Sequence, residues 1–329
     1  MSINTDEVSA VVKQFIKKEV PDALMKQNAF WNSLMKRLEY VPGGVNLQFP
    51  IKAIANASAG FISGGAQVVN VNQSQQDVYG ALNWKHYYYN VSFTLDEMTK
   101  ALESPEAVIN FFKQKKEGGK SDAIRGLSSA VFTSATAAPL AINGLADIVA
   151  ASGTAYAGLT DTDYATGVYL PIIDTSTSVV AYDPVNLMIN KVKARAQQSG
   201  ENANGIDMGF CNENVYGQYL SSVQNQQRFY ESTMVSTGFD GFKVNGVNIY
   251  MDANSQGSKD GSTGDNYLYV FPSSIMTFCY RWGLQGKASP FDGEVRITNQ
   301  PVQSNQSYIS GNLMCNNRRL IGVFKNLVA

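Results

Sequence analysis

Few side chains in this sequence are of the types that carry out enzyme chemistry, and their spacing argues against a catalytic centre. The single histidine, His86, stands beside Trp84, Lys85 and a run of tyrosines, where we predict a packing or interface role instead of acid–base catalysis. No Gly-x-Ser-x-Gly, Walker or Gly-x-Gly-x-x-Gly motif occurs in the context that its chemistry requires. The sequence therefore predicts no enzymatic activity, no catalytic residues and no cofactor.

Candidate metal ligands are equally sparse. Asp161, Asp163 and Asp174 lie in a turn-rich segment, but the spacing lacks the closing Glu and the central Gly of a calcium loop, so we predict solvated carboxylates. The cysteines are far apart in sequence and form no Cys-x-x-Cys pair: Cys211, Cys279 and Cys315. This pattern indicates buried free thiols made in a reducing compartment, with no zinc site, no disulfide framework and no metal.

The charge of the chain is low and balanced. Charged residues make up 16% of the 329 residues and the formal net charge is −1. This composition gives no electrostatic reason to bind nucleic acid or an anionic membrane, and it suits a protein that packs against many copies of itself. No apolar run approaches the ~18 residues of a membrane-spanning helix, and no signal peptide opens the chain.

The longest predicted element is a helix over residues 104–135. Ser104 suits its N-cap, Pro105 its first turn and Glu106 the positive end of its dipole. Gly118 and Gly119 interrupt it, so two interpretations stay open: two helices joined by a loop, or one long helix that can bend. Four lysines of this region either form its solvated face, which we favour, or touch nucleic acid: Lys113, Lys115, Lys116 and Lys120.

The residues before this helix read as an arm that needs a surface to lie on. Helical apolar spacing around residues 8–16 and 24–38 predicts docking on this subunit or on a neighbour. Residues 45–95 read as a long two-stranded arm with a polar tip and aromatic side chains on both faces. Since an isolated hairpin is marginal in water, we expect this arm to lie on another surface.

The second half of the chain alternates helices and strands. A helix over residues 183–200, a strand around Met208, a helix capped by Asn212, a hairpin turn at Asn245-Gly246 and a strand over residues 267–271 follow one another. Strand-like residues around a polar break end the chain at 308–324. This order indicates an α/β layer within an α+β protein.

Taken in order, these elements resemble the major capsid protein of tailed bacteriophages, the family with the Hong Kong 97 type shell fold. The most telling pieces are Asn-Gly-Leu-Ala-Asp at 143–147, Tyr-Ala-Gly at 156–158 and Gly-Asn-Leu-Met-Cys at 311–315, followed by Arg318 and Gly322. The resemblance implies an N-terminal arm at 1–44, an extended loop at 45–95, a peripheral domain at 96–182 with the 104–135 spine helix, an axial domain at 183–271, and strands at 272–329 that return to the peripheral domain.

The resemblance also implies a function. The chain would assemble into the icosahedral head shell around a double-stranded DNA genome, as hexamers and pentamers of itself, in the virion after assembly in the host cytoplasm. We expect a separate scaffold protein or none, because no room for a cleaved scaffolding segment precedes the first arm helix. Portal or decoration proteins are further expected partners, and DNA would be enclosed without sequence-specific binding.

Alternatives of other kinds stay open. One is a bacterial nanocompartment shell of the same fold that encloses cargo, and another is a β-rich phage tail or glycan-binding protein. Crosslinking between Lys52 or Lys85 and Asn316 or Asn317 is conceivable, but no motif singles these residues out, and we predict no crosslink.

Overall fold

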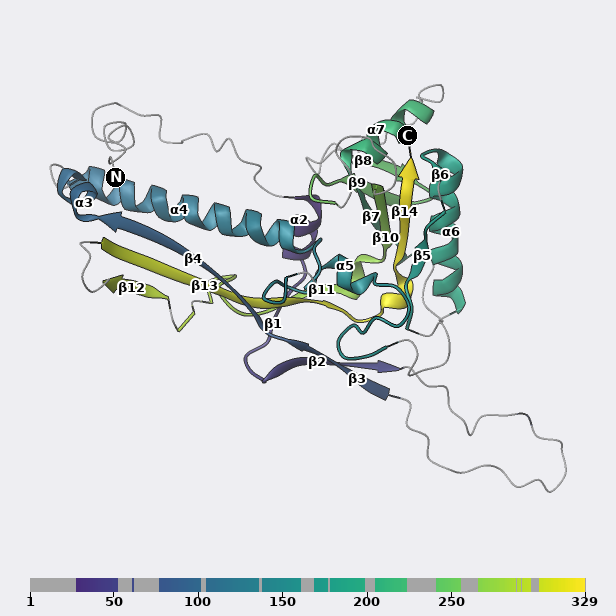
Figure 1. The fold of residues 1–329 in the computed structure, drawn as a ribbon, viewed down its shortest axis with the longest axis horizontal. Helices are drawn as coiled ribbons and strands as arrows, with labels where there is room; N and C mark the ends of the chain where they lie inside the picture. Colours follow the sequence, from purple (N-terminus) through teal and green to yellow (C-terminus); the bar gives the residue numbers. More distant parts are fainter. Residues whose placement is uncertain are drawn as a thin grey trace, which may run out of the picture.

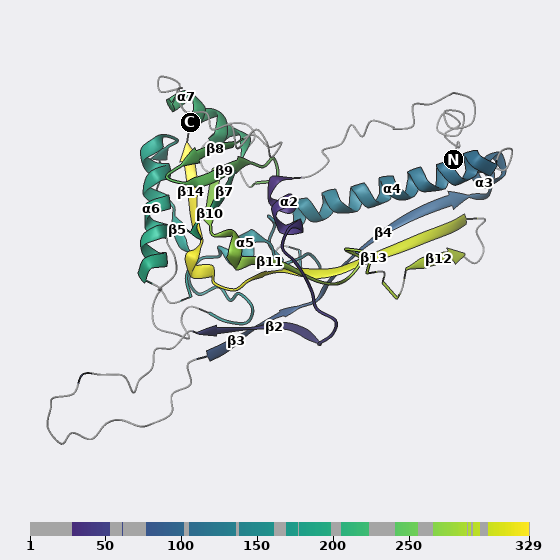
Figure 2. The ribbon, with the colours of Figure 1, turned by 180° about the vertical axis from the view of Figure 1, so that it is seen from behind.

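The computed structural model describes residues 28–52, 61, 77–101, 105–135, 138–160, 169–176, 178–198, 205–223, 241–255, 266–287, 289–290, 292–296 and 302–328. The predicted helix at 8–16, the loop tip at 56–76 except Phe61, and the carboxylates Asp161 and Asp163 lie outside these residues. The described chain forms a long helix-on-sheet plate at one end, an α/β layer at the other, and a two-stranded hairpin below their junction (Figures 1 and 2). This α+β arrangement confirms the predicted fold class.

The plate consists of the long helix α4, Pro105–Ala130, lying over a five-stranded sheet. Its strands are β1 Leu38–Tyr40, β4 Lys85–Thr94, β11 Met276–Trp282, β12 Gly293–Arg296 and β13 Val302–Cys315. A short helix, α3 Leu95–Ala101, joins β4 to α4. The helix α4 runs unbroken through Gly118 and Gly119, so the interpretation as two helices joined by a loop is wrong. It ends at Ala130, before the predicted end at residue 135.

Close packing holds α4 on β4. Alternate residues of β4 turn toward α4, and of these Val91 and Phe93 are buried. A Cβ atom on Gly119 would lie 2.7 Å from a methyl group of Val91, so this glycine permits the close approach of helix and strand. Lys115 of α4 pairs with Glu97 of α3 at 2.8 Å. The solvated-face interpretation therefore holds for the described Lys116 and Lys120, which are exposed, while Lys115 is partly buried.

The α/β layer is a seven-stranded sheet with the order β5-β14-β10-β7-β9-β8 and β6 beside β14. Its strands are β5 Ile172–Asp174, β6 Ser178–Val179, β7 Met208–Cys211, β8 Gly241–Val244, β9 Val247–Met251, β10 Asn266–Phe271 and β14 Gly322–Val328. Two helices accompany it, α6 Tyr182–Gln198 and α7 Glu213–Val223. The helix α6 buries the predicted apolar face: Val185, Met188, Ile189, Val192 and Ala196.

Local signals in this layer behave as predicted. The amide of Val215 donates to Asn212 Oδ1 at 3.0 Å, which confirms Asn212 as the cap of α7. Asn245 and Gly246 have φ angles of 49° and 82°, the left-handed pair that a tight hairpin turn requires, and they join β8 to β9. Gly322 touches α6, because a Cβ atom there would lie 2.9 Å from Met188 Sδ.

An aromatic cluster joins the two halves of the molecule. Phe30 belongs to α2, Ala29–Met35, and its ring centroid lies 4.9 Å from that of Phe210, 5.3 Å from that of Phe132 and 5.9 Å from that of Phe271. Phe132 follows α4, whereas Phe210 and Phe271 belong to the seven-stranded sheet. The described part of the N-terminal arm therefore docks on its own subunit, at the junction of the plate and the layer.

Two predicted strand pairings are wrong. The predicted two-stranded arm at 45–95 is shorter, because β2 Asn46–Lys52 pairs only with β3 Asp77–Asn83, and after Trp84 the chain continues as β4 beside β13. The last strand, β14, does not return to the plate but pairs with β10 and β5 in the seven-stranded sheet. In the described part of the chain, no helix is long and apolar enough to cross a membrane.

Candidate assembly surface at the root of the hairpin

The hairpin of β2 and β3 has one face covered by its own chain and one face open. Leu47, Phe49 and Ile51 alternate along β2 and are buried. Tyr79 of β3 points to the other side and is 65% exposed. The apolar side of the described hairpin therefore packs on its own subunit, and its outer face is open for contacts.

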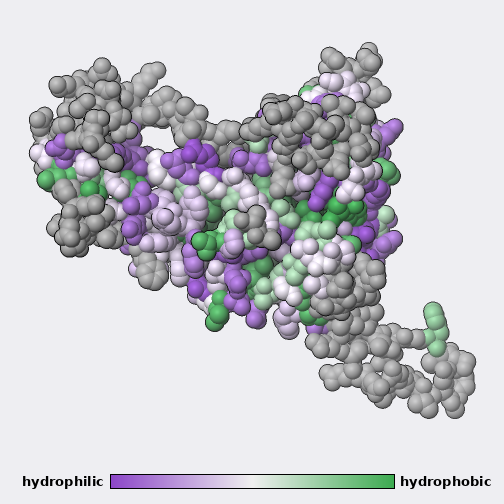
Figure 3. Space-filling model, viewed as in Figure 1, coloured by the Kyte–Doolittle hydropathy of each residue, from purple (hydrophilic) through white to green (hydrophobic). Residues whose placement is uncertain are grey.

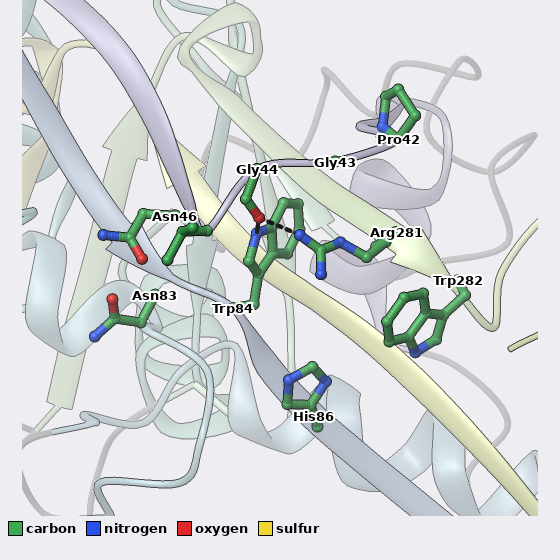
Figure 4. Close-up of a pocket in the computed structure, with 10 residues that line it drawn as sticks. Pro42, Gly43, Gly44, Asn46, Asn83, Trp84, His86, Arg281 and Trp282 are labelled. Atoms are coloured by element: carbon green, nitrogen blue, oxygen red, sulfur yellow. Dashed lines mark hydrogen bonds between the residues drawn. The ribbon is translucent and has the colours of Figure 1, made fainter. Parts of the chain in front are cut away.

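The root of the hairpin is fixed by a stack of side chains around Arg281 (Figure 4). The indole Nε1 of Trp84 donates to the carbonyl of Gly44 at 3.1 Å, and Arg281 Nη2 donates to the same carbonyl. The guanidinium carbon of Arg281 lies 4.7 Å from the ring centroid of Trp84 and 5.3 Å from that of Trp282. Cation–π contacts of this kind contribute about 0.5–2 kcal/mol each, so the stack ties both limbs of the hairpin to β11.

His86 extends this stack. Its ring lies 6.2 Å from that of Trp282 at an interplanar angle of 16°, and its side chain is exposed. Together with residues 42–46 and Asn83, the stacked side chains line an open hollow of about 780 Å³. We call it the root hollow. The stacking gives His86 a packing contact with Trp282, and its predicted interface role stays a prediction.

Asn312 connects the hairpin root to two of the motifs that carry the resemblance. Its side-chain amide donates to the carbonyl of Asn83 at 2.9 Å and to Asn143 Oδ1 at 2.8 Å, while its Oδ1 accepts from the amide of Asn143 at 2.9 Å. Asn312 is 0% exposed, so these bonds satisfy a polar side chain deep in the core. The Asn143 turn and the 311–315 segment, far apart in sequence, are therefore in direct contact.

The Tyr-Ala-Gly motif at 156–158 also contacts the hairpin, through β3. Ala157 and Gly158 have φ angles of 54° and 78°, and this tight turn presents the Ala157 carbonyl to the amide of Ala81 in β3 at 2.8 Å. The hydroxyl of Tyr156 accepts from the amide of Cys315 at 3.0 Å, and complete burial raises its pKa well above the ordinary value. This turn therefore holds the hairpin to β13.

Gly144 lets the Asn143 turn approach the end of α4. A Cβ atom there would lie 2.6 Å from the Val131 carbonyl, and the Leu145 amide donates to that carbonyl at 2.7 Å. Asp147, in the short helix α5 Leu145–Ile148, accepts from the Ala135 amide at 2.9 Å and from Asn143 Nδ2 at 3.0 Å. A substitution at Gly144 would collide with backbone atoms, which are the least able to move.

Two buried or paired carboxylates have shifted pKa values. Asp252 accepts from the amide of Phe30 at 3.1 Å and so caps the start of α2, and desolvation by burial raises its pKa. Asp174 pairs with Lys191 at 2.6 Å and accepts from Ser176, and these contacts lower its pKa to about 2. Both groups act within the fold as anchors of α2 and α6.

The described residues offer no group of His, Cys, Asp or Glu side chains suited to a metal ion. The three cysteines are buried and free, as predicted. Burial raises the pKa values of Cys279 and Cys315 to about 12 and raises that of Cys211 further above its ordinary range. Thiols of this kind are unreactive near neutral pH, which fits a packing role.

Of the residues considered for crosslinking, Lys85 and Asn317 have side-chain partners within their own chain. Lys85 Nζ donates to the carbonyl of Pro139, Asn317 Oδ1 accepts from the Arg319 amide at 3.2 Å, and the Asn316 amide donates to the Ile275 carbonyl at 3.1 Å. Lys52 is exposed at the end of β2, opposite Asp77. The absence of a crosslink stays a prediction.

Sequence reasoning missed Arg281 and Trp282, which form the wall of the root hollow. The available signal was an arginine followed by a tryptophan at the end of an apolar strand, since arginine is seldom buried and tryptophan is seldom buried completely. Figure 3 shows apolar and polar side chains interspersed over the described surface on one side of the molecule. The hollow itself is marked by its stacked aromatic and cationic side chains.

The comparisons with known proteins agree in the fold. No protein-family profile matches the chain, and no curated protein matches it in sequence. The cyanophage A-1(L) capsid asymmetric unit is similar in structure, with a TM-score of 0.63 and 11% identity over 96% of this chain and 97% of that chain.

Two further solved structures are similar over almost the full length. The capsid of the Myoviridae phage XM1 has a TM-score of 0.58 and 11% identity over 99% of both chains. The holo-SrpI encapsulin complex from Synechococcus elongatus has a TM-score of 0.59 and 9% identity over 100% of this chain and 97% of that chain. The chain therefore has the Hong Kong 97 type shell fold of tailed-phage major capsid proteins, which encapsulins share.

Proposed function

We propose that this protein is the major capsid protein of a tailed bacteriophage, a non-enzymatic subunit that assembles into the icosahedral shell around a double-stranded DNA genome. The observation that carries the proposal is the full-length likeness to phage capsid chains, with 97% of the A-1(L) chain and 99% of the XM1 chain covered. The hairpin of β2 and β3 projects from the body of the subunit (Figure 1). Its outer face is open and is suited to contacts between copies.

The parts of the subunit have distinct roles in this proposal. Residues 1–44 form the N-terminal arm, and the extended loop runs from Val45 to Asn83, because the strand after Trp84 pairs with β13. The plate with α4 is the peripheral domain and includes β11, β12 and β13. The seven-stranded sheet with α6 and α7 is the axial domain, and it includes β5, β6 and β14.

The principal partner is the chain itself, in hexamers and pentamers of the shell within the virion. A near-zero net charge of −1 supports dense packing of identical copies, since large charges of one sign would repel. A separate scaffold, a portal and decoration proteins are expected partners during assembly in the host cytoplasm. DNA is enclosed without sequence-specific contacts.

An encapsulin-like cargo shell is the second candidate, and the likeness to the SrpI encapsulin over 100% of this chain favours it. The two functions differ in content, because a phage head holds DNA and a cargo shell holds protein. Fold similarity alone does not separate them.

Electron microscopy of the purified protein, with analysis of the particle content, tests both. Closed icosahedral particles are the expected result, together with heads that contain nuclease-protected DNA when the protein is isolated from infected cells. Particles that enclose only a co-purifying protein would favour the cargo shell. A protein that stays a small oligomer at high concentration would overturn both functions.

A further inference from the structure

The root hollow has the chemistry of an anion-binding site. It is an open space of about 780 Å³, and none of its ten lining residues is an Asp or a Glu. Arg281 and His86 lie on its walls, and Trp84 and Trp282 stand on either side of the guanidinium group (Figure 4). The hollow therefore combines cationic and aromatic groups without a carboxylate to neutralise them.

Arg281 is only partly satisfied within its own chain. Its Nη2 donates to the Gly44 carbonyl, whereas its buried Nε has no hydrogen-bond acceptor among the described residues. Among those same residues, no carboxylate lies within ion-pair distance of it. Since the indoles lie against its faces and Nε is buried, the terminal nitrogens of the guanidinium are the part that can bind, and a carboxylate is the natural acceptor for them.

The edge of the hollow favours a protein segment over a small anion. Val45 lines it and is 91% exposed. Aromatic and arginine side chains are enriched at protein–protein interfaces, and the exposed Val45 adds an apolar side chain to those of Trp84, Trp282 and Arg281. Each copy of this protein also carries exposed carboxylates outside any described ion pair, among them Asp96, Glu117 and Asp183, so a second copy offers the complementary charge.

We propose that the root hollow binds a carboxylate-bearing segment of a second copy of this chain, with Arg281 as its ion-pair partner and Val45 as an apolar contact. The inference rests on the proposed function, since it requires copies to assemble. It adds a defined receptor surface to that function and identifies the chemistry of the segment that enters it.

Photo-crosslinking in mixed particles tests the contact directly. Particles are assembled from equal amounts of ¹⁴N- and ¹⁵N-labelled subunits that carry Val45→p-benzoylphenylalanine, and crosslinked peptides are identified by mass spectrometry. We expect mixed-isotope crosslinks from position 45 to one segment that contains an Asp or a Glu, and none in unassembled subunits. Tyr182→p-benzoylphenylalanine, on α6 and 48% exposed in the wild-type side chain, is the control and should give a different peptide or none.

The possible outcomes distinguish failure of this inference from failure of the proposed function. Failure of the wild-type protein to form particles would overturn the proposed function. Intact particles with only same-isotope crosslinks, with crosslinks to a different protein, or with no crosslink from position 45 would overturn the receptor surface and leave the proposed function standing.

Charge variants test the role of Arg281. Because salt screens ion pairs, the yield of wild-type and Arg281→Lys particles should fall as NaCl rises, whereas Arg281→Met should give several-fold fewer particles at low salt and a flatter dependence. Arg125→Met is the matched control, since it removes a partly exposed arginine of α4 that pairs with Asp122 and lies outside the root hollow. It should keep the wild-type salt dependence. Equal salt dependence in Arg281→Met and wild type would contradict the ion pair.

Discussion

Asn312 shows how much of this fold depends on one uncharged side chain. It is fully buried and joins the hairpin root at Asn83 to the Asn143 turn, so its loss leaves several backbone and side-chain groups without partners. Burying an unsatisfied polar group costs more than the net gain from an ordinary hydrogen bond. The asparagine is therefore a structural requirement of the junction.

Asn312→Ala should lower the free energy of unfolding on the order of 2–4 kcal/mol, because about 1–3 kcal/mol is lost for each buried group left unpaired. Chemical denaturation of the unassembled subunit measures this change. Asn83→Ala is the matched control, since only its backbone carbonyl takes part and its side chain is exposed. It should change stability by less than about 0.5 kcal/mol. Equal effects of the two variants would contradict the network.

The ion pair of Asp174 should make the free energy of unfolding depend on pH. Lys191 and Ser176 hold its pKa at about 2, below the ordinary 3.8, so the pairing stabilises the folded state above that ordinary value. This stability is lost as the pH falls from 3.8 through about 2. The pair is partly exposed, so the effect is at most about 1 kcal/mol.

The measurement compares unfolding free energies of wild type and Asp174→Asn across that range of pH. Above it, the wild type should be the more stable of the two, and the difference should shrink as the pH falls toward 2. A difference that stays constant over the range would show that Asp174 carries no linked proton.

The long helix illustrates why the same residue type can have opposite roles one position apart. Gly118 has no atom within 4 Å of an added Cβ, whereas an added Cβ on Gly119 would lie 2.7 Å from Val91. The sequence-based hypothesis assigned both glycines to bending. The structure gives Gly119 a packing reason, while bending at this place stays a prediction.

Gly118→Ala should therefore raise the free energy of unfolding by up to about 1 kcal/mol, the helix propensity that glycine forfeits. Gly119→Ala should lower it, since the methyl group must displace Val91 from a buried position. Thermal unfolding of both single variants measures the contrast. Stabilisation by both would mean that Val91 yields to the added methyl group, and it would contradict the packing role of Gly119.

Sequence-based predictions were correct for features that depend on residues close together in the sequence, and wrong for pairings between distant strands. The buried face of α6, the cap at Asn212 and the turn at Asn245 depend on neighbours within a few residues, and all were predicted correctly. The change of partner at Trp84 and the place of β14 depend on pairing between distant strands. Alternating apolar residues suit either sheet equally, so no local pattern distinguishes them.

At the scale of the whole molecule, the hairpin root is where the parts of the chain meet. Arg281 reaches it from β11, Asn312 from β13, and the Ala157 turn from the loop before β5. The hairpin root is therefore tied to the five-stranded sheet, through contacts that connect residues more than 100 positions apart in sequence. This arrangement suits a subunit whose projecting part must bear load from its neighbours.

Removing residues 56–76 separates folding of the subunit from assembly of the shell. The predicted loop tip, except Phe61, lies outside the described residues, whereas the root contacts of Trp84, Arg281 and Asn312 lie in the body and stay intact. We therefore expect the deletion variant to unfold at nearly the wild-type denaturant concentration. It should fail to form closed particles in sedimentation and electron microscopy.

A variant of the same length with that segment replaced by a Gly/Ser linker is the control for chain length, and it should fail in the same way. Normal particles from the deletion would show that the loop does not build the shell, and a deletion variant that is itself unfolded would show that the root depends on the tip.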